Sequence, residues 1–339
     1  MPSIPTDGPE IPIAVRTDDA RFADLPDFPF APNYRDVANP YSQTPLRMHY
    51  VDEGPRDAPV VLMVHGEPAW SFLYRKLIPV FTAAGLRAIA LDQIGFGRSD
   101  KPTRPSHYSF ANHIEWVRQL VVGLDLRDVT LVCQDWGGPV GMGVVAKEMD
   151  RFSRICAANT MLHTGDPALA GRIEWAAHAS GEHDATVSSA LLDWRMASTR
   201  TPEFEASPSI PFATARGVSD EVAAAYDAPF PSEWHKAGMR QYPILIPVTE
   251  SDEGAAINRA TWEALARFDR PFLTLFGDSD PPTRGWAEIF RERIPGAKGQ
   301  PHETLERAGH FWQEDCGAEA ATRLVAWIQS TSVQRTDAL

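Results

Sequence analysis

The sequence predicts an α/β fold in which a mostly parallel sheet is covered by helices and interrupted by a helical insertion. Short apolar runs alternate with helical segments up to about residue 160 and again from about residue 248. Such alternation is typical of parallel sheets with helices on both faces. Between these regions no strand pattern appears. We therefore expect a core domain from residues 1–160 and 248–339, and a helical cap domain at 161–247.

The elements of the first core segment follow from their apolar patterns. Residues 1–45 are rich in Pro and Asp without clear periodicity, which favours an extended arm. Near-continuous apolar runs indicate strands that are covered on both faces. Strands are expected at residues 46–52, 59–65, 86–92, 129–133 and 152–159, and helices at 72–84, 108–124 and 139–149.

Helical patterns dominate the insertion, and the alternation resumes after it. Within the insertion we expect helices at residues 172–179, 187–198 and 220–226. The later core segment predicts helices at 256–268, 285–294 and 318–329, with strands at 271–276 and 303–307.

Composition excludes several classes of partner. The chain has 339 residues and a net charge of −13, from 32 basic and 45 acidic residues, which argues against nucleic acid and anionic membrane as partners. Three cysteines are too few for a disulfide framework and favour a reducing compartment, the cytoplasm. We expect no signal peptide and no membrane span, because no segment has the required apolar run.

One turn carries the strongest functional signal. Small residues, Cys133 and Gly137, lie two positions either side of Asp135, between a predicted strand and a predicted helix. This is the pattern of a nucleophile elbow, a strained turn that presents one side chain above the sheet. The usual nucleophile there is Ser, whereas this chain has Asp followed by Trp136.

Two further residue types complete the order nucleophile, acid, base of the α/β-hydrolase fold. His310 follows the last predicted strand and supplies the base. The strand end at 159–161 has no carboxylate, so the acid comes from the turn after the cap, at Asp278 or Asp280. Each residue alone is better explained as a turn former or a packing residue, and the joint order favours catalysis.

An aspartate nucleophile implies a two-step reaction. A carboxylate is ionised at neutral pH, so it can displace a leaving group from sp³ carbon without a base and form an ester. Hydrolysis of that ester requires a base that activates water, which is the role expected of His310. The backbone N–H groups of Trp136 and Glu67 occupy the positions where this fold places oxyanion donors.

Four segments together resemble the haloalkane dehalogenases, in the branch with Glu in the His-Gly-Glu-Pro loop and the acid after the cap. The segments are residues 65–70, 92–102, 134–138 and 228–231. The resemblance implies hydrolysis of a halogenated aliphatic substrate to an alcohol, a halide ion and a proton, with no cofactor and no metal. It also places the acid three residues after Gly277, at Asp280.

The resemblance further implies two tryptophan ring N–H donors for the leaving halide. Trp136 is the first, since it follows the nucleophile. For the second, in the cap, Trp194 is preferred, Trp175 is the next choice and Trp234 is a further candidate. The segment 166–189 is longer than is usual in the family and leaves this assignment open. His163, His178 and His183 lack metal-site spacing and are expected at the surface.

Three alternatives remain at this stage. An epoxide hydrolase shares the triad but needs two cap tyrosines, for which Tyr226 and Tyr242 are available. Fluoroacetate dehalogenases resemble the elbow, yet they have arginine beside the nucleophile, where this chain has Trp136-Gly137-Gly138. A non-catalytic binding protein with the same fold is disfavoured by the complete triad. The sequence does not specify an oligomeric state.

Overall fold

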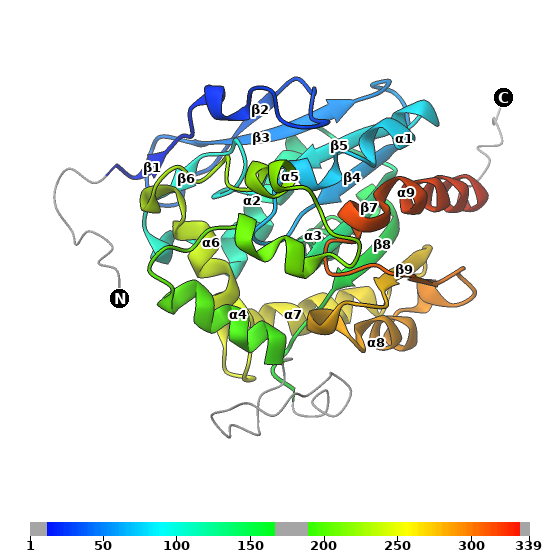
Figure 1. Cartoon of the computed structure of the whole chain (residues 1–339). Coiled ribbons are helices and arrows are strands. Elements are labelled where there is room, and N and C mark those ends of the chain that lie inside the picture. The colour runs from blue at the N-terminus through cyan, green and yellow to red at the C-terminus, as the bar shows by residue number, and fades with distance from the viewer. Residues whose placement is uncertain (1–11, 167–188, 333–339) are drawn as a thin grey trace.

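The computed structural model describes residues 12–166 and 189–332, and an eight-stranded sheet runs through this part of the chain (Figure 1). Its order is β10-β9-β8-β7-β4-β5-β3-β2. Neighbours from β10 to β5 pair in parallel, whereas β3 pairs antiparallel with both β5 and β2. The strands are β2 (Asn33–Val37), β3 (Leu46–Glu53), β4 (Val60–Val64), β5 (Arg87–Leu91), β7 (Val129–Asp135), β8 (Phe152–Thr160), β9 (Phe272–Gly277) and β10 (Glu303–Leu305). Two short strands, β1 (Ala14–Val15) and β6 (Lys101–Pro102), pair separately.

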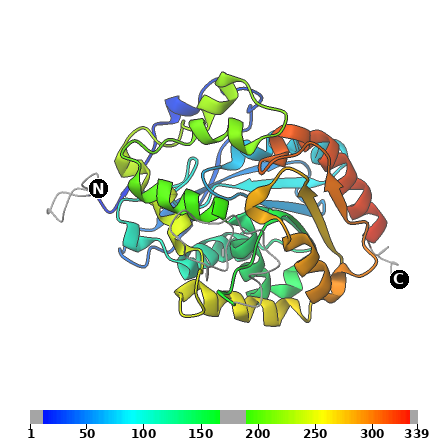
Figure 2. The ribbon, with the colours of Figure 1, turned by 60° about the horizontal axis from the view of Figure 1, so that its bottom comes forward.

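Helices cover both faces of the sheet, which explains why the central strands are continuous apolar runs. Helices α1 and α9 pack together on one face, and α2, α3, α7 and α8 lie on the other (Figure 2). All residues of β4 and β7 are buried as a result. The helices are α1 (Ile78–Ala83), α2 (Phe110–Gly123), α3 (Gly137–Lys147), α7 (Glu253–Leu265), α8 (Trp286–Arg293) and α9 (Trp312–Thr331). The predicted α/β-hydrolase architecture is confirmed.

The described part of the insertion is helical and lies over the carboxyl ends of the strands. It contains α4 (Ser189–Arg200), α5 (Asp220–Ala225) and α6 (Ala237–Gln241), joined by short 3₁₀ turns (Figure 1). A hydrogen bond from Tyr226 to a buried ion pair of the core attaches it to the core. The guanidinium of Arg75 donates to Glu314 in α9 at 2.5 and 2.8 Å, and the Tyr226 hydroxyl, which follows α5, donates to the same carboxylate at 2.6 Å. The helix expected at 172–179 lies outside the described residues.

Several predicted elements differ from the observed ones for identifiable reasons. The arm at 1–45 contains β2, which shows no apolar alternation because only Val37 of this edge strand is buried. The helix expected from residue 72 begins instead at Ile78, since Pro79 lacks the N–H that a helix interior needs. The last helix begins at Trp312, six residues earlier than predicted, and is kinked at Cys316.

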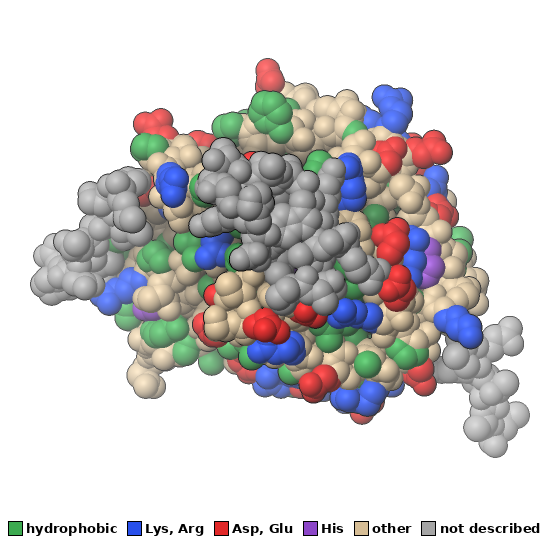
Figure 3. Space-filling view, turned by 90° about the horizontal axis from the view of Figure 1, so that it is seen from below, with side chains coloured by type: hydrophobic (Ala, Val, Ile, Leu, Met, Phe, Trp, Pro, Cys, Tyr) green, Lys and Arg blue, Asp and Glu red, His purple; other side chains and the backbone are tan. Residues whose placement is uncertain are grey.

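The surface carries mixed charge, and no described helix is both long and apolar enough to cross a membrane. On the face shown in Figure 3, acidic and basic side chains are interspersed in small groups. On that face, therefore, the net charge of −13 is not gathered into one patch.

Candidate active site

The turn between β7 and α3 holds Asp135 in a strained conformation. Its φ is +51°, a region that residues with a Cβ rarely adopt. Close packing enforces the turn, because a Cβ on Gly137 would lie 1.9 Å from the carbonyl oxygen of Val64 in β4. A small residue is therefore required two positions after the nucleophile. The turn points the Asp135 carboxylate out of the sheet and into a cavity.

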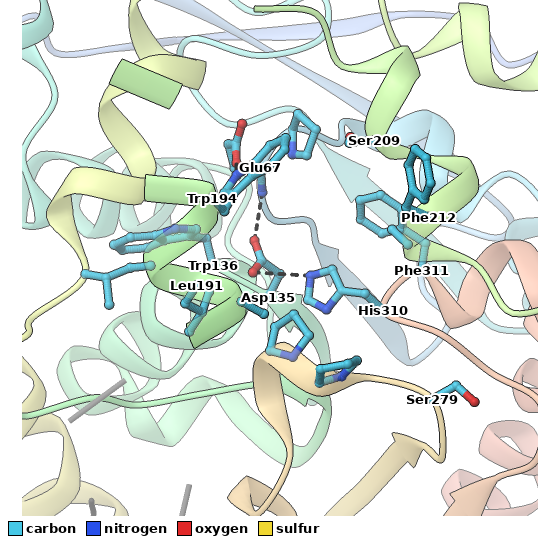
Figure 4. Close-up of a pocket in the computed structure, with 16 residues that line it drawn as sticks. Glu67, Asp135, Trp136, Leu191, Trp194, Ser209, Phe212, Ser279, His310 and Phe311 are labelled. Atoms are coloured by element: carbon cyan, nitrogen blue, oxygen red, sulfur yellow. Dashed lines mark hydrogen bonds and ion pairs between the residues drawn. The ribbon is translucent and has the colours of Figure 1, made fainter. Parts of the chain in front are cut away.

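The structure brings Asp135, His310 and Asp280 together, although they lie on three separate loops. His310 Nε2 is 3.4 Å from Asp135 Oδ2 (Figure 4). His310 Nδ1 is 2.9 Å from Asp280 Oδ1. The other candidate acid, Asp278, accepts the backbone N–H groups of Arg307 and Ala308 instead. Asp280 is therefore the carboxylate in position to orient the imidazole.

The two carboxylates change the acidity of His310. Burial lowers its pKa, but the charge of Asp280 and the hydrogen bond to Asp135 more than offset that effect and raise the pKa to about 10. The two carboxylates thus favour the protonated form of the imidazole. Removal of the Asp135 charge removes one of the two stabilising partners of the imidazolium.

One carboxylate oxygen of Asp135 already has a backbone donor. The N–H of Glu67, in the loop after β4, donates to Asp135 Oδ1 at 2.9 Å. Trp136 is the N-cap residue of α3, at a helix start where backbone N–H groups lack helical acceptors. Asp135 Oδ1 therefore lies where an oxyanion is stabilised, and Oδ2 remains on the side of His310.

A cavity of about 390 Å³ surrounds these groups and is lined mainly by apolar side chains. Trp136 lies beside Asp135, and the cap covers the site with α4 and a 3₁₀ turn (Figure 4). An apolar cavity with few polar groups suits an uncharged aliphatic substrate. The principal apolar lining residues are Trp136, Leu191, Trp194, Phe212, Ile246 and Phe311.

Comparisons with known proteins agree with this arrangement. Residues 59–315 match the family described as alpha/beta hydrolase fold. The haloalkane dehalogenase of Psychrobacter cryohalolentis is 46% identical, over 93% of this chain and 97% of the relative. That of Mycobacterium marinum is 44% identical, over 92% and 99%. The solved tetrameric haloalkane dehalogenase DpaA from Paraglaciecola agarilytica is 35% identical, with a TM-score of 0.79, over 91% and 97%.

The chain belongs to the haloalkane dehalogenase family. The contacts of the two cap tyrosines bear on the alternative of an epoxide hydrolase. The Tyr226 hydroxyl donates to Glu314, and the Tyr242 hydroxyl donates to Gln93 and shares a hydrogen bond with His113. Both tyrosines are fully buried, and neither lines the cavity. The paired phenol donors that an epoxide hydrolase needs are therefore directed away from Asp135.

The tryptophans expected to bind halide differ in whether they line the cavity. Trp136 and Trp194 both line the cavity. The ring N–H of Trp194, from α4, donates to the side chain of Glu67 at 2.5 Å. Trp234 is absent from the cavity lining, and Trp175 lies outside the described residues. Trp194 is thus the described cap tryptophan that reaches the site.

Sequence reasoning missed two amides that hold His310. Gln134 Nε2 lies 3.1 Å from His310 Nε2 and donates to the His310 carbonyl oxygen at 3.2 Å. Asn159 Nδ2 donates to the carbonyl oxygen of Gly309 at 2.7 Å, and its Oδ1 accepts the N–H of Gly277. Asn159 therefore joins the loops of His310 and Asp280. The sequence signal that could have identified Asn159 was its position at the end of β8, where side chains of the site gather.

Two further sequence expectations concern histidine and cysteine. The expectation that His163 lies at the surface is wrong: it is 1% exposed and packs edge-on against Trp286, because β8 leads the chain inward at this point. His178 and His183 lie outside the described residues. Cys133 and Cys156 are buried in β7 and β8 as expected, and burial raises the pKa of both thiols.

Proposed function

We propose that the chain hydrolyses the carbon–halogen bond of haloalkanes through an alkyl ester on Asp135. The geometry that supports this role is an aspartate at the nucleophile elbow, with His310 Nε2 at 3.4 Å and the Glu67 N–H at 2.9 Å, in an apolar cavity. The products are an alcohol, a halide ion and a proton. Membership of the haloalkane dehalogenase family accounts for the reaction class.

In the first step, Asp135 Oδ2 attacks the carbon that bears the halogen. The new C–O bond takes the place of the carbon–halogen bond, whose electron pair leaves with the halide. No proton moves, so the protonated state of His310 does not oppose this step. The ring N–H groups of Trp136 and Trp194, both on the cavity wall, are the donors we assign to the departing halide.

In the second step, water hydrolyses the ester and His310 acts as the general base. Alkylation neutralises Asp135 and so removes one of the charges that raise the His310 pKa. His310 then loses its Nε2 proton to solvent. The neutral imidazole takes a proton from water, whose oxygen adds to the ester carbon while negative charge develops on Oδ1. Asp280 stabilises the imidazolium, which donates its proton to the departing alkoxide, so the alcohol leaves with the original Oδ2. The carboxyl group that forms on Asp135 then releases its proton, which is the proton among the products.

The domain division, the ligands and the location belong to the same proposal. We assign residues 161–247 to the cap and 1–160 with 248–339 to the catalytic core, supported by α4 and the 3₁₀ turns of the insertion, which line the cavity. The partners are a small halogenated aliphatic substrate and halide, and the chemistry uses no cofactor. Three free cysteines, all buried, support a cytoplasmic location.

A panel of bromoalkanes tests the proposal by release of bromide. We expect bromide and alcohol in equal amounts, because each turnover breaks one carbon–bromine bond. Styrene oxide serves as the competing substrate. Formation of the diol without bromide from any bromoalkane would instead identify an epoxide hydrolase, and no reaction with either substrate would indicate a binding protein.

A further inference from the structure

The side chain of Glu67 lies at the active site but has no role in the two steps above, which use only its backbone N–H. The residue is 4% exposed. One carboxyl oxygen, Oε2, accepts the ring N–H of Trp194. The other, Oε1, is buried without a hydrogen-bond partner in residues 12–166 and 189–332. A buried carboxylate normally has several donors, so this one is unusual.

The surroundings of Glu67 favour its neutral form. Burial raises its pKa well above the usual value, and the negative charge of Asp135 raises it further, whereas the Trp194 hydrogen bond and His310 act in the opposite direction. The buried Tyr242 hydroxyl is the third ionisable group that interacts with it. One indole donor does not compensate an ionised carboxylate for the loss of water.

Protonation has a consequence for Trp194. An indole carries a single N–H, which in this structure is given to Glu67 and cannot at the same time be given fully to a halide. Hydrogen bonds to an ionised acceptor are about twice as strong as those to a neutral one. An ionised Glu67 would therefore retain the N–H and place a second negative charge beside the departing halide. A neutral Glu67 releases the N–H more easily.

We propose that Glu67 is a positioning residue that works as a neutral carboxylic acid, holding the Trp194 ring N–H at the cavity wall and yielding it to the halide. This inference rests on the proposed function, because it requires Trp194 to be a halide donor. The backbone N–H of Glu67 keeps its separate contact with Asp135.

Infrared difference spectroscopy tests the charge state directly. The wild-type protein at neutral pH should show the carbonyl band of a protonated carboxylic acid, and the band should be missing in Glu67→Gln. The wild-type band should also disappear as pH is raised, which provides a measurement that needs no variant. A spectrum at neutral pH with only ionised carboxylates would overturn the proposal.

Bromide binding, followed by tryptophan fluorescence, tests the positioning role. Glu67→Gln remains uncharged and keeps an acceptor for the indole, so its bromide affinity at neutral pH should stay within about threefold of wild type. Glu67→Leu, a matched variant of similar size, has no acceptor and should bind bromide at least about tenfold more weakly. Equal affinities in the two variants would contradict a positioning role, provided that both unfold at temperatures close to that of wild type.

Halide release by the wild-type protein separates this inference from the function on which it rests. If wild type releases bromide from bromoalkanes while the two variants behave alike, only the assignment of Glu67 fails. If wild type releases no bromide, the proposed function fails and the role of Glu67 fails with it.

Discussion

Replacing His310 with alanine should separate the two steps of the reaction. Asp135 keeps the backbone N–H of Glu67 at 2.9 Å and needs no base to attack carbon, so alkylation should continue. The variant loses the imidazole that lies 3.4 Å from Asp135 Oδ2, and no other imidazole lines the cavity among the described residues. The alkyl ester should therefore accumulate.

The expected magnitudes differ for the two steps. A positioned general base contributes about 10²- to 10⁴-fold, so ester hydrolysis should slow by that factor, equivalent to about 3–5 kcal/mol. Alkylation should change by less than about tenfold, or about 1.4 kcal/mol, because it loses only the neighbouring positive charge. Turnover is then limited by the second step, and each chain should release one bromide ion in a rapid burst.

Intact-protein mass spectrometry after exposure to 1-bromobutane provides the assay. The His310→Ala variant should gain the mass of one butyl group, located at Asp135 by peptide mapping. Asp135→Ala is the control, since it lacks the nucleophile and should remain unmodified. An unmodified His310→Ala protein, or one that turns over at the wild-type rate, would refute the two-step mechanism.

Four other predictions follow from particular contacts. Asp280→Asn replaces the carboxylate that lies 2.9 Å from His310 Nδ1 with a neutral amide, so ester hydrolysis should slow by about 10²- to 10⁴-fold while the bromide burst persists in rapid-quench measurements. Trp136→Phe keeps the ring but loses the N–H, and bromide inhibition should weaken by about 10- to 100-fold, since a hydrogen bond to a charged group is worth about 1.5–3 kcal/mol. Glu314→Ala leaves buried Arg75 without its partner and should lower the free energy of unfolding in urea by about 3–5 kcal/mol. The pKa of His310 in the folded protein, about 10, exceeds its ordinary value of 6.5. The stability that the protonated imidazole contributes is therefore complete below pH 6.5 and is lost as pH rises through 10. Thermal midpoints should fall over this pH window more in wild type than in His310→Ala.

The parallel part of the sheet could be predicted from the sequence because each strand is buried on both faces. Continuous apolar runs such as Val60–Val64, separated from one another by short helical segments, are typical of strands in a parallel sheet. The antiparallel edge was only partly predictable. β3 alternates and was found, whereas β2 is largely solvated and carries no apolar signal. The start of the last helix was missed because α9 begins before a break in helical geometry at Cys316.

The site was predictable where it depends on chain order. The elbow pattern around Asp135 and the position of His310 after the last strand are local features, and a parallel sheet brings such strand ends to one edge. The choice between Asp278 and Asp280 was not local. Both follow β9 within a few residues, and only the packing of the loops determines that Asp280 contacts His310 while Asp278 binds backbone N–H groups.

The sequence by itself determined the fold class and the family, and it supplied the three residues that we propose as the triad, because these depend on periodicity, spacing and order along the chain. Only the tertiary structure decided how the cap engages the core. It paired Trp194 with Glu67 across 127 positions, directed Tyr242 away from Asp135, and buried His163. These contacts depend on distances and directions between side chains remote in sequence, which a local pattern does not encode.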